Sequence, residues 1–138
     1  MVEDRDVYKD LSKESKRKYK RDIFNKYGRK SYQNATKSIK KMSKEEWAEY
    51  QYDLNAIFQE IALAMTKHSF KDETIQNMIS EHHSIIERLN PSPKESYIEL
   101  AKLYSHNEDF IIFFDKYEKG FSQFLEQSMS YFAKNNLE

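Results

Sequence analysis

Glycine and proline are almost absent from this chain, and their scarcity limits the possible folds more than any other feature. Only two residues of each type occur among the 138. A sheet protein of this length needs a turn about every 8–12 residues, and turns rely heavily on these two residue types. The sequence therefore predicts an all-α fold, a single compact domain of about five to six helices around one core.

Aromatic residues supply an unusual share of that core. They make up 14% of the chain, although only 38% of all residues are hydrophobic. The stretch YSHNEDFIIFFDKYEKGFSQFL, residues 104–125, concentrates seven of them: Tyr104, Phe110, Phe113, Phe114, Tyr117, Phe121 and Phe124. Core packing is the more frequent role for any single ring. We interpret the cluster as a whole differently, as more ring surface than two short helices need and therefore as the wall of a ligand cleft.

Hydrophobic periodicity and capping motifs place the individual helices. The motif SKEE at Ser43 is a capping box that begins a long helix over about residues 44–67. A further helix carries apolar residues from Ile75 to Leu89 and stops at NPSP, where Ser92 and Glu95 form a second capping box with Pro93 at the first helical position.

Two more local signals lie near the C-terminus. Asn107 is expected to cap a short helix, with Asp109 in its first turn, where the helix dipole favours a carboxylate. Gly120 is expected to end that helix in a left-handed conformation, and a last helix follows from about Phe121.

Charge is distributed unevenly along the chain. Residues 1–50 hold 15 Lys and Arg against 9 Asp and Glu, a net charge of +6, and residues 51–138 hold 8 against 14, a net charge of −6. Residues 3–27 have helical spacing but little apolar surface to bury, so we expect the N-terminal third to be mobile in the empty domain. Direct nucleic-acid binding by this segment is disfavoured, because it shows no helix-turn-helix pattern and its basic residues alternate with acidic ones.

Several classes of chemistry find no support in the sequence. There is no cysteine, which excludes disulfides and thiolate sites. His82 and His83 point about 100° apart on a helix, so they cannot readily share a metal ion, and His82 on an apolar stripe is more often a hydrogen-bonded core histidine. No phosphate loop or nucleophile motif is present. We therefore expect a protein that is not an enzyme and uses no cofactor.

No apolar run reaches the length of a membrane span, and no signal-peptide pattern opens the sequence. The expected location is the cytoplasm. The final Leu137-Glu138 is compatible with a cloning remnant, in which case the chain would be an excised domain.

Motifs across most of the chain resemble the TipAS family of antibiotic-recognition domains, which follow the DNA-binding region in MerR-type transcriptional activators. They run in order and at characteristic spacing from about Phe24 to Phe132: FNKYG, SYQNA, the single tryptophan Trp47, EHHSII, and LAKLYSHNEDFIIFFDKYEKGFSQFLEQSMSYF. The resemblance implies a globin-like helical fold that binds thiopeptide antibiotics and related drugs in a cleft. It also implies an N-terminal part that becomes ordered when the ligand binds.

The resemblance implies a division of the chain and a set of ligand contacts. Residues 1–40 would be a basic segment, either a ligand lid or the end of a linker helix, and residues 41–138 the helical ligand-binding domain. The implied ligand-binding residues are Tyr27, Gly28, Tyr32, Trp47, Tyr50, His82, Tyr104, Asp109, Phe110, Phe113 and Phe114. Asp109 or His82 would supply the orienting polar contacts.

The predicted function is that of a ligand-sensing effector domain of a MerR-type regulator. Some family members hold their ligand through a cysteine thioether, and this chain has no cysteine, so the expected binding of an antibiotic-like molecule is non-covalent. DNA would be contacted only through an N-terminal helix-turn-helix domain outside these residues. The full-length regulator would be a dimer, and the isolated domain is compatible with a monomer. The alternative is a protein-interaction module whose aromatic groove accepts a partner helix.

Overall fold

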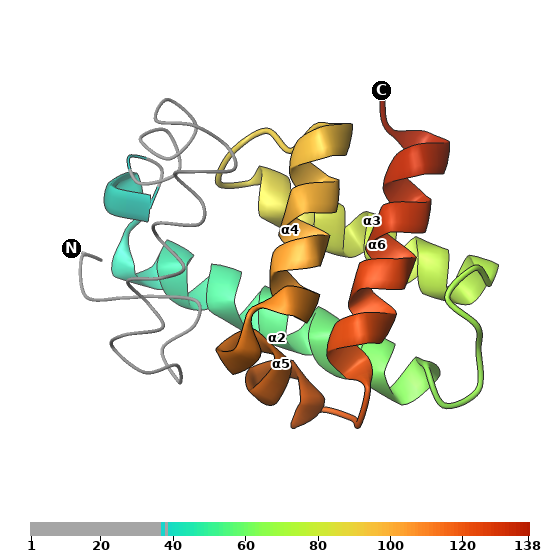
Figure 1. Cartoon of the computed structure of the whole chain (residues 1–138). Helices are drawn as coiled ribbons and strands as arrows, with labels where there is room; N and C mark the ends of the chain where they lie inside the picture. The colour runs from blue at the N-terminus through green and yellow to red at the C-terminus, as the bar shows by residue number, and fades with distance from the viewer. Residues whose placement is uncertain (1–36, 38) are drawn as a thin grey trace.

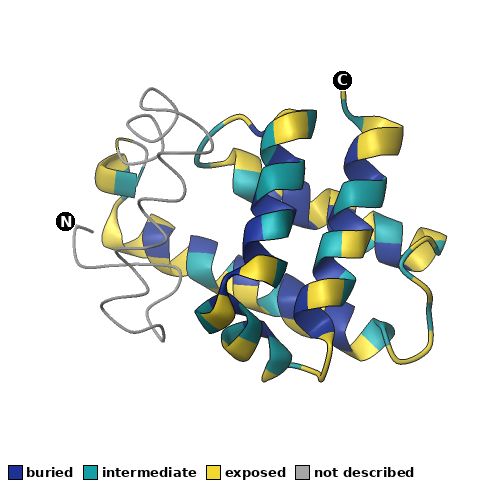
Figure 2. Cartoon of the chain, in the orientation of Figure 1, coloured by how far each residue is buried: buried dark blue, intermediate teal, exposed yellow. Residues whose placement is uncertain are grey.

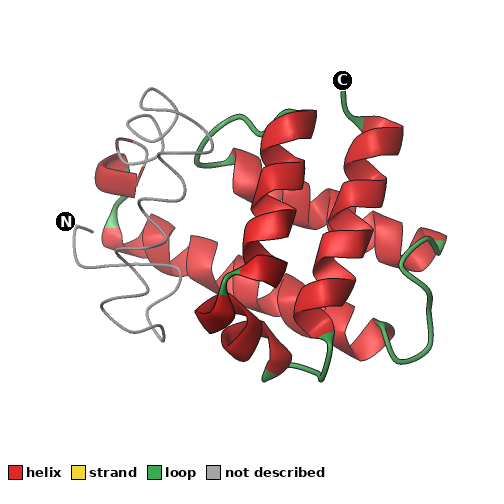
Figure 3. Ribbon diagram, viewed as in Figure 1, coloured by secondary structure: helices red, strands yellow, loops and turns green. Residues whose placement is uncertain are grey.

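The structure is a computed structural model that describes Lys37 and residues 39–138. Five labelled helices follow one another along the chain: α2 (Lys44–Ala64), α3 (Glu73–Glu87), α4 (Lys94–His106), α5 (Glu108–Asp115) and α6 (Phe121–Asn136). No strand occurs among the described residues (Figure 3). The predicted all-α fold is confirmed. The helix expected over residues 3–27 lies outside the described residues, as does nearly all of the basic segment 1–40.

The helices form two crossed layers. In Figure 1, α2 and α3 run antiparallel to each other, and α4 and α6 form a second antiparallel pair that crosses them. The short α5 lies at one corner, between the end of α4 and the start of α6. This arrangement brings the inner faces of all five helices together, so that one core forms where the two layers cross.

Each helix turns a buried stripe toward that core, and Figure 2 shows these stripes facing inward on both layers. On α2 the buried side chains recur at helical spacing, from Trp47 and Tyr50 through Phe58 to Ile61. On α6 they run from Phe121 to Ala133. Because the buried positions follow the period of the helix, apolar spacing along the sequence predicts which faces pack together.

Two predicted caps are present as expected. At the start of α2, the Glu46 amide donates to Ser43 Oγ over 3.1 Å and the Ser43 amide donates to Glu46 Oε1 over 2.8 Å. At the start of α5, the Phe110 amide donates to Asn107 Oδ1 over 3.1 Å. Each cap satisfies amides that have no carbonyl partner in the first turn of a helix.

The predicted capping box at Ser92 and Glu95 is wrong. Pro93 takes the N-cap position of α4, and no side chain caps the helix. Ser92 is instead buried in the corner between α3 and α4, where its amide donates to Glu87 Oε2 over 3.1 Å and its carbonyl accepts from His83 Nε2 over 2.8 Å. Contacts of the Ser92 backbone with the preceding helix therefore replace the local cap.

Gly120 is left-handed as predicted, with φ of 82°, but it does not end α5. That helix stops at Asp115, and Gly120 stands directly before α6 as its N-cap residue. The long helix α2 likewise ends at Ala64, three residues before the predicted end at 67. Among the described helices, none combines the length and the apolar composition that a membrane-spanning segment requires.

Candidate functional site

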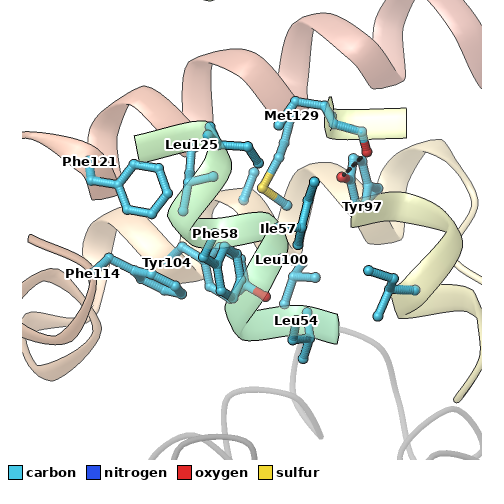
Figure 4. Packing of buried hydrophobic residues seen from close by; sticks show 14 of the residues in the cluster. Leu54, Ile57, Phe58, Tyr97, Leu100, Tyr104, Phe114, Phe121, Leu125 and Met129 are labelled. Carbon is cyan, nitrogen blue, oxygen red and sulfur yellow. Dashed lines mark hydrogen bonds between the residues drawn. The ribbon is translucent and has the colours of Figure 1, made fainter. Parts of the chain in front are cut away.

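Phe58 on α2 stands at the centre of the aromatic cluster, which is shown close up in Figure 4. Its ring centroid lies 5.0 Å from that of Phe114 on α5, 6.2 Å from that of Tyr104 on α4 and 6.3 Å from that of Phe121 on α6. These three contacts are edge-on, which is a favoured geometry for aromatic pairs. One side chain on the long helix thus joins the three C-terminal helices.

The expectation that residues 104–125 carry more rings than the interior can bury is wrong. The side chains of Tyr104, Phe110, Phe114 and Phe121 are at most 1% exposed. The other three rings, those of Phe113, Tyr117 and Phe124, are partly buried and pack against the same core. The physical reason is that burial of each ring removes about 150–250 Å² from water, and rings of this size fill the space between the two helix layers.

His82 forms a buried polar contact at the edge of this cluster. Its Nδ1 shares a hydrogen bond of 2.7 Å with the Tyr97 hydroxyl, and its ring lies 5.3 Å from that of Phe58. The side chain is fully buried, and desolvation, together with a smaller contribution from the neighbouring His83, lowers the pKa of His82 to about 3. Burial likewise raises the pKa of Tyr97 well above its usual range. The interpretation of His82 as a hydrogen-bonded core histidine is confirmed.

His83 is buried as well, which the sequence did not predict. Its Nε2 donates to the Ser92 carbonyl over 2.8 Å, and its ring lies edge-on to Tyr97 at 4.7 Å. Two adjacent histidines can both be buried because α3 packs on more than one side, against the core and against the corner that leads into α4. In the sequence, only the NPSP motif after α3 indicated a corner at which His83 could be buried.

A second aromatic group lies near the start of α2. The rings of Trp47 and Tyr50 are stacked at 5.8 Å with an angle of 19° between their planes. The Arg88 guanidinium carbon, just past the end of α3, lies 5.3 Å from the Tyr50 ring centroid, and Arg88 Nη1 donates to Asp53 Oδ2 over 2.8 Å. We call Trp47, Tyr50 and Arg88 the Trp47 stack.

Electrostatics in the Trp47 stack are dominated by burial. Burial raises the pKa of Tyr50 far above its usual range, and the nearby Tyr104 raises it further, while the Arg88 cation acts in the opposite direction. Tyr50 is therefore a neutral phenol. Sequence reasoning missed Arg88 and Asp53, because 35 residues separate them and neither belongs to an apolar stripe.

The candidate ligand residues thus fall into separate groups. The rings of Tyr104, Phe114 and His82 contact Phe58, and those of Phe110 and Phe113 join the same cluster through Phe114. Trp47 and Tyr50 form their own stack. Asp109 is partly buried in the first turn of α5, as predicted. Tyr27, Gly28 and Tyr32 lie outside the described residues. A ligand-binding role for all of these residues stays a prediction.

Comparison with known proteins gives a direct family assignment. The family model of the TipAS antibiotic-recognition domain matches residues 19–132, which is most of the chain. Searches of curated proteins and of solved structures found no match. The matched range contains every described helix up to the last turn of α6. The chain therefore belongs to the TipAS family of antibiotic-recognition domains.

Proposed function

We propose that this chain is a ligand-sensing effector domain of a MerR-type transcriptional regulator and that it binds thiopeptide-like or other hydrophobic heterocyclic antibiotics. The observation that carries the proposal is the family match over residues 19–132.

Binding is proposed to be non-covalent and without turnover. The chain has no cysteine to form a thioether with the ligand. The buried histidine His82 is held in its neutral form and hydrogen-bonded to Tyr97, an arrangement that suits a packing role more than acid-base catalysis. Mass spectrometry after incubation should therefore recover the ligand unchanged.

Regulation of transcription is proposed to require the intact protein. In that protein, an N-terminal helix-turn-helix domain would bind DNA and a dimer would form in the cytoplasm. Ligand binding would change the shape of the effector domain and thereby the activity of the DNA-binding half. Such coupling requires the ligand to bind one shape of the domain better than the other.

A thermal-shift panel of thiopeptide antibiotics tests the proposal. A ligand at about 100 times its dissociation constant stabilises the folded state by about 2.7 kcal/mol, which raises the melting temperature by several degrees in a domain of this size. Isothermal titration should then give one ligand per chain. An unchanged melting temperature across the panel would contradict the proposal.

Asp109 provides a sharper test of the polar contacts. The variant Asp109→Ala should lose affinity for the panel compound that binds best, because it removes a partly buried carboxylate from the start of α5. The exposed Glu108→Ala beside it is the matched control. Full affinity in a folded Asp109→Ala protein would remove this residue from the site.

A second candidate function, a protein-interaction module, is favoured by one surface feature. Tyr52 and Leu63 are 72% and 76% exposed on α2. They are about three helical turns apart and so lie on the same side of that helix. A partner helix could pack along this side. An amphipathic helical peptide that raises the melting temperature, with no response to any thiopeptide, would favour this alternative.

A further inference from the structure

Three exposed lysines lie on a short helical turn that precedes α2 (Figure 1). Ile39 and Met42 anchor this turn, because both are partly buried and pack against the core. Lys40 and Lys41 follow Lys37 at the spacing of one helical turn, so all three share one side of the turn, and all three are exposed. We call Lys37, Lys40 and Lys41 the lysine face.

The charge of the lysine face is not neutralised by nearby carboxylates. Among the described residues, no ion pair involves these lysines. Residues 23–44 hold seven Lys and Arg and no Asp or Glu, because the alternation of basic and acidic residues that disfavoured nucleic-acid binding ends at Asp22. The next carboxylates in the sequence are those of Glu45 and Glu46, and Glu46 Oε1 already accepts from the Ser43 amide in the cap of α2. Positive charge is therefore concentrated in the residues that lead into α2.

The rest of the chain has the opposite charge. Residues 51–138 carry a net charge of −6, and the whole chain is neutral. A polyanion repels an acidic surface and attracts a basic one, so a polyanionic partner is expected to approach the domain from the lysine face. The charge distribution therefore favours one orientation of the domain toward such a partner.

We propose that the lysine face binds the phosphate backbone of double-stranded DNA without reading its sequence, in addition to the contacts of the proposed helix-turn-helix domain. A duplex presents closely spaced negative charges, which neighbouring ammonium groups can neutralise together. Lysine meets phosphate as a flexible point charge, so the contact adds affinity and positions the protein but does not discriminate between bases. In the proposed regulator the DNA-binding domain precedes these residues in the chain, and the lysine face belongs to the part of the effector domain that follows it directly.

Fluorescence anisotropy of a labelled DNA duplex, titrated with the whole chain, measures this contact. Binding should weaken as salt is added, with a linear fall of log K against the logarithm of the salt concentration, because bound lysines displace counterions from the phosphates. Two duplexes of unrelated sequence should bind equally well. A wild-type chain that binds neither duplex in about 50 mM salt overturns the inference.

A triple variant, Lys37→Gln with Lys40→Gln and Lys41→Gln, locates the contact on the lysine face. Each lost phosphate contact should make the salt slope shallower by about 0.9, so the slope should change by about 2–3 and the affinity in about 50 mM salt should fall more than about tenfold. The matched control removes the same charge from three exposed lysines elsewhere and should keep the wild-type slope. Its substitutions are Lys116→Gln, Lys119→Gln and Lys134→Gln.

Two further results would overturn the inference. Equal losses of affinity in the two triple variants would show that the net charge of the chain, and not the lysine face, controls binding. Tighter binding to vesicles that contain phosphatidylserine than to the duplex, in the same salt, would assign the face to a membrane surface. No antibiotic takes part in these measurements, so their failure leaves the proposed ligand binding intact, and a negative thermal-shift panel contradicts only the proposed function.

Discussion

At the scale of single residues, the neutral state of His82 makes the stability of the domain depend on pH. Its pKa is about 3 in the folded protein and about 6.5 in an unfolded chain, so the unfolded state binds a proton first as the pH falls. The free energy of unfolding should therefore be highest above pH 6.5. It should fall through this residue as the pH drops below 6.5, because the unfolded chain then takes up a proton that the buried imidazole does not.

Urea unfolding at pH 6.5 and pH 5 measures this effect before most carboxylates titrate. His82→Leu should flatten the difference between the two pH values, because no proton is then taken up at this position. His106→Leu is the matched control, since the His106 side chain is 68% exposed. An equal pH dependence in wild-type and His82→Leu proteins would show that another group is responsible.

At the scale of elements, the connection between α5 and α6 depends on one backbone conformation. Gly120 has φ of 82°, and a Cβ atom placed there would meet no other atom within 4 Å. Gly120→Ala should therefore lower the free energy of unfolding by about 1–2 kcal/mol. The cause would be the left-handed backbone, which disfavours alanine, because the added Cβ atom would not clash with any neighbour. Urea denaturation measures the loss.

Asparagine tolerates the left-handed region better than alanine, so Gly120→Asn should recover part of the stability that Gly120→Ala loses. The neighbouring exposed Lys119→Ala serves as the control for changes in surface chemistry. A Gly120→Ala protein as stable as Lys119→Ala would mean that the connection can adopt another conformation at no cost.

At the scale of the whole molecule, Phe58 joins the two helix layers. Its ring contacts His82 on α3, Tyr104 on α4, Phe114 on α5 and Phe121 on α6. Phe58→Ala should therefore cost about 3–5 kcal/mol, a large part of the roughly 5–15 kcal/mol that stabilises a typical domain. Circular dichroism during thermal unfolding should show a much lower and broader transition.

The partly buried Phe70 is the appropriate comparison for Phe58. Its ring stacks edge-on with that of Tyr131 at the periphery, 6.0 Å away, and has no part in the contact between the layers. Phe70→Ala should cost clearly less than Phe58→Ala. Equal losses would argue that the central cluster does not hold the layers together.

Much of the fold followed from the sequence because its signals are local. The capping box at Ser43, the cap at Asn107 and the left-handed Gly120 each depend on contacts or dihedral angles within a few residues. Apolar spacing also predicted the buried faces and the core position of His82. Apolar residues recur at helical spacing on the face of a helix that packs against the core, so one sequence was enough to predict these features.

Only the tertiary structure decided which aromatic groups meet and which polar groups pair. The ring cluster became core because Phe58 approaches it from a helix about 50 residues away in the sequence. Ser92 lost its capping role to contacts with α3, and Arg88 paired with Asp53 across two helices. Such contacts depend on how the helices are arranged in space, and the period of a single helix does not determine that arrangement.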